Sequence, residues 1–121
     1  MLGANCQGST VSVNGTLFFS HPSTPYGNLD SDSGRMNGWI KFSIDLGQTW
    51  WLWRQVEPMS FAYSSLTLIG TNESAGTVTL GIVYEGTVSG APVVAPFYDV
   101  STITWATVTG PLPRAIGSGL P

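Results

Sequence analysis

The chain has 121 residues, of which 42% are hydrophobic and only 9% are charged, and its formal net charge is −3 at pH 7. This composition suits one folded domain with one core rather than a disordered chain, and no apolar stretch approaches the ~20 residues of a membrane-spanning helix. The four basic residues, Arg35, Lys41, Arg54 and Arg114, are scattered, so this segment offers no basic surface for nucleic acid.

The first third of the chain predicts three strands. Polar and apolar residues alternate over Ser9–Val13, and the hairpin dipeptide Asn14-Gly15 leads into a return strand at Thr16–Ser20. The prolines, glycines and short polar residues of His21–Asn37 indicate a long loop. Alternation resumes over Trp39–Leu46. The inward positions of that strand are expected to be Ile40, Phe42, Ile44 and Leu46.

The remaining strands are predicted from the same period of two. Thr49–Val56 is one strand, and Glu57-Pro58 is expected to end it. Phe61–Ile69, Ala75–Glu85 and Val100–Val108 follow as three more strands. In the clearest of them one face carries Val78, Leu80, Ile82 and Tyr84, and the other carries Thr77, Thr79, Gly81, Val83 and Glu85. One face of that strand is therefore expected to be buried.

Seven or eight strands without a convincing helical period predict an all-β protein. Tight and long connections together favour an antiparallel β-sandwich of the jelly-roll type, with an immunoglobulin-like sandwich as the alternative. The sandwich domain is expected to span 1–109. Residues 110–121 are rich in Pro and Gly and are expected to form a C-terminal tail or linker.

Tryptophans crowd into one strand of the sequence, Trp50-Trp51-Leu52-Trp53. On a strand, Trp51 and Trp53 share one face while Trp50 and Leu52 share the other, so both faces are apolar. One pair must then be covered by a loop, by a partner chain or by a ligand. The sequence therefore predicts that Trp50, Trp51 and Trp53 form an interface or a surface for stacking sugars, to which Gln48 and Gln55 would add hydrogen bonds.

The segment Asp30-Ser31-Asp32-Ser33-Gly34 places two carboxylates two residues apart before a glycine. Oxygen ligands of this kind suit calcium, and Asp30 and Asp32 are the candidate ligands. The alternative is an ordinary solvated turn, because Asp, Ser and Gly are also the usual turn residues.

Residues for catalysis are scarce. The sequence has one histidine, His21, and one cysteine, Cys6, so zinc sites built from several such ligands and internal disulfides are excluded. No nucleophile elbow, phosphate-binding loop or dinucleotide-binding pattern occurs. The sequence therefore predicts a protein that is not an enzyme. No secretory signal peptide is expected at Met1-Leu2-Gly3-Ala4.

Residues 75–92, Ala-Gly-Thr-Val-Thr-Leu-Gly-Ile-Val-Tyr-Glu followed by a Gly-rich loop that ends at Pro92, resemble the coat proteins of small icosahedral RNA viruses of the tombusvirus and nodavirus kind. The two acids that flank the tyrosine in that family's strand correspond here to Val83 and Glu85, so the calcium or interface role that the family gives to those acids is not carried over to this chain. The resemblance implies a protruding capsid domain in the virion, with homodimer contacts, assembly and host attachment.

We therefore expect a non-enzymatic capsid surface domain that associates with itself, binds no nucleic acid through this segment and does not insert into membranes. A host receptor or glycan would be a further partner. The alternative is a secreted carbohydrate-binding module or lectin, and a third interpretation is a phage tail or decoration protein. No cofactor is expected apart from the candidate calcium.

Overall fold

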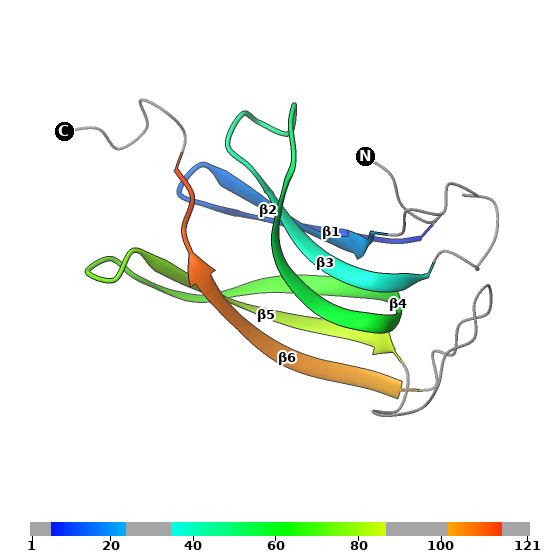
Figure 1. Cartoon of the computed structure of the whole chain (residues 1–121). Helices are drawn as coiled ribbons and strands as arrows, with labels where there is room; N and C mark the ends of the chain where they lie inside the picture. The colour runs from blue at the N-terminus through cyan, green and yellow to red at the C-terminus, as the bar shows by residue number, and fades with distance from the viewer. Residues whose placement is uncertain (1–5, 24–34, 87–101, 115–121) are drawn as a thin grey trace.

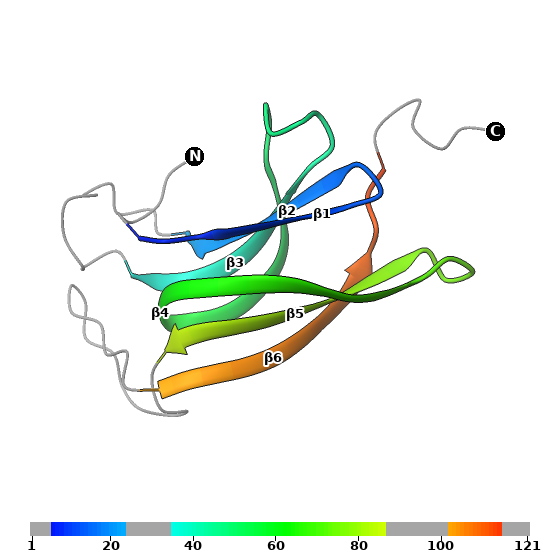
Figure 2. The same ribbon diagram turned by 180° about the vertical axis from the view of Figure 1, so that it is seen from behind.

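The computed structural model describes residues 6–23, 35–86 and 102–114. They form β1 (Ser9–Val13), β2 (Thr16–Pro22), β3 (Met36–Ser43), β4 (Trp51–Asn72), β5 (Thr77–Gly86) and β6 (Thr102–Pro111). The strands lie in chain order in one antiparallel sheet. The sheet curls into a half-barrel, so that β1 to β3 face β5 and β6 across the core (Figures 1 and 2). Within the described ranges no helix is long and apolar enough to span a membrane.

The all-β, antiparallel fold class predicted from the sequence is confirmed by this arrangement. The jelly-roll type is not confirmed. Every hydrogen-bonded neighbour among the described strands is also the next strand in the chain, whereas the Greek-key units of a jelly roll place non-consecutive strands side by side.

Strand β4 produces the curl. It is 22 residues long, and its first half pairs with β3 while its second half pairs with β5. Register shifts interrupt both ladders, and such bulges bend a strand and increase its twist. The predicted break at Glu57-Pro58 is wrong. Pro58 has no register partner on β3, so its missing N–H removes no ladder hydrogen bond and the strand continues.

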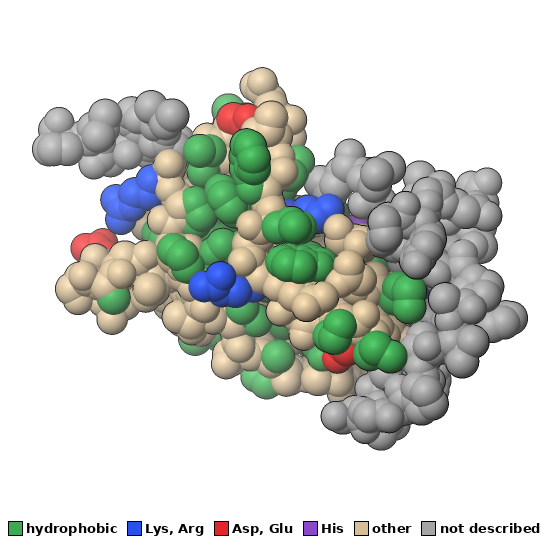
Figure 3. All heavy atoms as spheres, in the orientation of Figure 1, with side chains coloured by type: hydrophobic (Ala, Val, Ile, Leu, Met, Phe, Trp, Pro, Cys, Tyr) green, Lys and Arg blue, Asp and Glu red, His purple; other side chains and the backbone are tan. Residues whose placement is uncertain are grey.

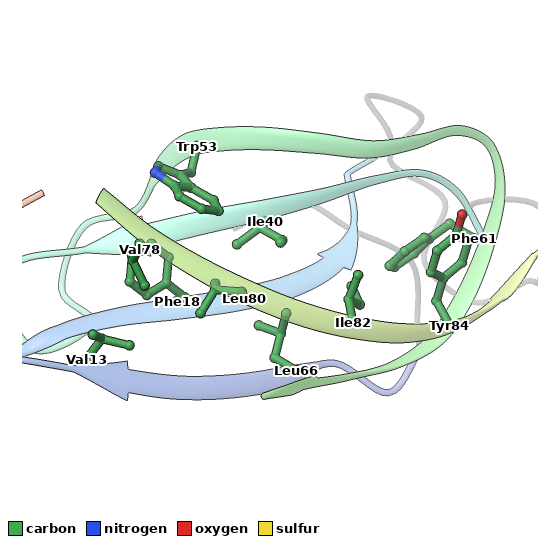
Figure 4. Close-up of a cluster of buried hydrophobic side chains, with 10 residues drawn as sticks. All are labelled: Val13, Phe18, Ile40, Trp53, Phe61, Leu66, Val78, Leu80, Ile82 and Tyr84. Carbon is green, nitrogen blue, oxygen red and sulfur yellow. The ribbon is translucent and has the colours of Figure 1, made fainter. Parts of the chain in front are cut away.

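The core lies inside the curl (Figure 4). The inward residues predicted for β5 are all buried, and Phe18, Ile40 and Phe61 are fully buried beside them. Phe61 stacks on Tyr84 with their ring centroids 5.0 Å apart. Since burying one large apolar side chain stabilises a fold by about 1.5–3 kcal/mol, the cluster accounts for the cohesion of the two halves of the sheet.

The first hairpin has the predicted turn. Asn14 and Gly15 adopt φ of 50° and 84°, the left-handed pair that a two-residue type I′ turn requires. Ser9 pairs with Ser20 and Val13 with Thr16, so β1 has the predicted bounds and β2 runs two residues further than predicted.

The third strand ends earlier than predicted. β3 stops at Ser43, and Leu46, expected to face inward, is 84% exposed with φ of 61°. The region expected to begin the tail is ordered against the body. β6 continues to Pro111, and the Leu112 N–H donates to the Gly76 carbonyl at 2.9 Å. The expected boundary at residue 109 therefore falls inside a strand.

Candidate functional site

The structure separates the three tryptophans singled out in the sequence. Trp53 lies at a register shift of β4, only 7% exposed, edge-on to the Phe18 ring with centroids 5.0 Å apart. Its indole N–H donates to the Pro111 carbonyl at 2.8 Å. Trp51, the first residue of β4, is 58% exposed. The prediction that Trp51 and Trp53 share one face of the strand is therefore wrong, because Trp53 belongs to the core and Trp51 is exposed.

Trp50 lies before β4, in the loop that follows β3. Its ring packs against Phe19 with centroids 5.6 Å apart, and its indole N–H donates to the Gly47 carbonyl at 3.0 Å. Gln48 lines a hollow with Trp50, while Gln55 donates to the Asn37 side chain at 2.7 Å. The sugar-stacking surface of Trp51, Trp53, Gln48 and Gln55 is thus not assembled.

Asp45 holds the 44–49 loop in shape. Its carboxylate accepts hydrogen bonds from the Ser43 hydroxyl at 2.7 Å and from the backbone N–H and hydroxyl of Thr49. Ser43 in turn accepts the Gly47 N–H at 2.8 Å. The hydrogen bonds from Thr49, followed by the one from Ser43, lower the pKa of Asp45 from 3.8 to about 2.

The lowered pKa makes the loop sensitive to acid. Since the folded state favours the ionised carboxylate, Asp45 contributes stability that is present above pH 3.8 and is lost as the pH falls through about 2. An Asp45→Asn variant should therefore be less stable than wild type at neutral pH, and the gap should close across that window. Denaturant melts of both proteins at several pH values measure this. A gap that stays constant with pH would contradict the role of the charge.

A second surface was not singled out in the sequence. This surface is the outer face of the sheet where the C-terminal part of β4, β5 and β6 lie side by side. There Val83 of β5 pairs with Ser65 of β4 and with Trp105 of β6. Around this row lie exposed apolar side chains, which we call the outer β4–β6 patch: Tyr63, Ile69, Val83, Ile103 and Trp105. Alternation in the sequence predicts that Val83 shares a face of β5 with other outward residues and that Ile103 and Trp105 share a face of β6. It does not predict whether another part of the chain covers that face, and in the described part of the chain none does.

The Trp105 ring occupies the space above Gly81 of β5. A Cβ at Gly81 would come within 2.2 Å of the Trp105 ring and 3.1 Å of Ile69, so the glycine leaves room for the indole to cross β5. Trp105 nevertheless remains 56% exposed and Ile103 69% exposed. Beside them is a shallow hollow of about 220 Å³, whose lining includes Tyr63, Val83 and Ile103.

Few charges surround the patch. Glu85 lies at its edge and accepts the Tyr63 N–H at 3.2 Å, while the Arg35 guanidinium lies 5.3 Å from the centre of the Tyr63 ring. In Figure 3, which shows one face of the molecule, basic and acidic side chains are likewise few. The surface chemistry is therefore dominated by apolar and neutral polar groups.

The candidate calcium ligands Asp30 and Asp32 lie outside the described residues. Within the described part of the chain, no group of three or more His, Cys, Asp or Glu side chains is placed to hold a metal ion.

Comparison with protein-family models, with curated proteins and with solved structures finds no match to this chain.

Proposed function

We propose that this chain is a non-enzymatic surface domain of a viral capsid that joins copies of itself through the outer β4–β6 patch. The observation that carries the proposal is the patch itself: two aromatic and three aliphatic side chains are exposed on the outer face of β4, β5 and β6. Contiguous exposed apolar surfaces of this kind mark interaction sites in soluble proteins.

The occupant that fits the patch best is a second copy of the chain. Identical chains most often pair about a two-fold axis, which brings the same surface of each copy together. Val83, the register partner of Trp105, lines a hollow that a partner's side chain can enter. With a net charge of −3 and 9% charged residues, two copies repel each other only weakly.

The size of the patch is adequate for the centre of such an interface. An aromatic side chain buries about 150–250 Å² and a standard interface buries about 800 Å² on each partner. Two aromatic and three aliphatic residues would supply the apolar centre. Outward threonines of the same strands, Thr67, Thr107 and Thr109, would supply the polar rim.

Assignment to a capsid rests on the resemblance of residues 75–92 to tombusvirus and nodavirus coat proteins. In this proposal the curled sheet belongs to a jelly-roll type of coat-protein sandwich, and its copies project from the virion. Homodimer contacts and host attachment are then the tasks of the domain.

Replacing the centre of the patch should dissociate the assembly. An Ile103→Thr/Trp105→Thr variant keeps β-branched residues on β6 but loses the two large apolar side chains at the centre of the patch. The dissociation constant of the dimer should rise roughly 30-fold to 1,000-fold, the range for loss of an interface hot spot. Sedimentation velocity of wild type and variant over a concentration series measures this.

The matched control is Trp51→Thr, which removes an equally exposed tryptophan from the first half of the sheet. It should leave the oligomeric state unchanged, and circular dichroism should show that both variants are folded. A wild type that is monomeric at every concentration would refute the proposal, as would loss of association in the Trp51 variant alone.

A further inference from the structure

A hollow of about 340 Å³ lies on the first half of the sheet, away from the outer β4–β6 patch. Lys41, Gln48, Trp50 and Leu52 line it. Lys41 is the middle residue of a cross-strand row, with Phe19 on β2 and Leu52 on β4 as its register partners. A basic side chain therefore stands among apolar ones.

The ammonium group of Lys41 has no partner within the described part of the chain. No ion pair or hydrogen bond involves it among the described residues, although the side chain is only 8% exposed. The Lys41 nitrogen is not among the fully buried, unpartnered polar atoms of the described residues, so it keeps contact with solvent while its stem is covered. Burial lowers the pKa of Lys41 below its usual value. An anion in the hollow would supply the missing partner.

Contacts within the chain hold the other walls of the hollow in place. The hydrogen bonds of Asp45 fix the loop that carries Gln48 and Trp50, and Phe19 supports the Trp50 ring. Since the Trp50 N–H is already bonded to Gly47, the indole offers an apolar surface rather than a donor. Gln48 offers an amide, which can both donate and accept.

We propose that this hollow binds a carboxylated sugar. The carboxylate pairs with the Lys41 ammonium, the amide of Gln48 bonds to ring hydroxyls, and the apolar face of the sugar ring lies against Trp50 and Leu52. Small-molecule sites usually have mainly apolar walls with a few polar groups that orient the ligand. A simple carboxylate would use only the Lys41 part of this site.

The test uses D-glucuronic acid and N-acetylneuraminic acid as probes, with glucose and acetate as comparisons, and ligand-observed NMR to measure binding. The acidic sugars should bind wild type more tightly than either comparison. A Lys41→Met variant keeps the apolar stem, and affinity should fall roughly 10-fold to 100-fold, as expected for loss of a charged hydrogen bond. An Arg54→Met variant also removes one positive charge, but from β4 and outside the lining of the hollow. It should bind the sugars as wild type does.

Wild type provides a second measurement in case Lys41→Met does not fold. The pKa of Lys41, followed through its ε-methylene signals, should rise when glucuronic acid is added, because a bound carboxylate favours the ammonium form. An unchanged pKa at saturating sugar would overturn the proposal, as would unchanged affinity in a folded Lys41→Met protein. Acetate binding as tightly as the sugars would overturn the sugar assignment.

Discussion

A Trp53→Ala variant should lose about 3–5 kcal/mol of its free energy of unfolding, the range for truncating a buried aromatic side chain. The change removes the edge-on contact with Phe18 and leaves a cavity between the two halves of the sheet. It also leaves the Pro111 carbonyl without its indole donor. Denaturant unfolding followed by far-UV circular dichroism measures the loss.

Trp51→Ala is the matched control, since it is the same substitution two residues away at a 58% exposed position. Its stability should change by no more than about 0.5 kcal/mol, as is usual for surface sites. Equal losses in the two variants would contradict the placement of Trp53 in the core. A Trp53 variant of unchanged stability but altered oligomeric state would instead favour the interface role predicted from the sequence.

A Gly38→Ala variant should lose about 1–3 kcal/mol through overpacking. A Cβ at this position would lie 2.1 Å from the Phe61 ring, with two further ring atoms within 2.6 Å. Phe61 is fully buried and stacked on Tyr84, so it has no free space to retreat into. We expect the loss at the upper end of the range.

Gly70→Ala is the same substitution at a glycine of β4 where an added Cβ atom would have no other atom within 4 Å. There alanine should be neutral or should stabilise the protein by about 0.5–1 kcal/mol, because it restricts the unfolded chain. Chemical melts of both variants decide the matter. Destabilisation by Gly70→Ala equal to that of Gly38→Ala would show that the contact with Phe61 is not the cause.

Local sequence patterns predicted the parts of the fold that local chemistry determines. Asn14-Gly15 specifies its turn without help from the rest of the chain. The inward residues of β5 follow from strict alternation between two turns. The end of β3 was missed because alternation continues through Ile44 and Leu46, while the hydrogen bonds of Asp45 and the positive φ at Leu46 stop the strand.

Features that depend on tertiary packing could not be predicted. Pro58 is a strand breaker by its own chemistry, and only the register shifts against β3 make it harmless. Trp51 and Trp53 are equivalent by alternation, but a bulge and the Phe18 ring select one of them for the core. Periodicity places Ile103 and Trp105 on one face of β6, but it does not say whether that face is covered.

The central claim is that the outer β4–β6 patch is where two copies of the chain meet, and side-chain NMR of wild type at increasing protein concentration tests it most directly. The account predicts that the Trp105 indole and the methyl groups of Val83 and Ile103 shift or broaden with concentration, while the indole of Trp51 does not. Spectra that do not change from micromolar to millimolar protein, or changes confined to the Trp51 side of the sheet, would contradict it.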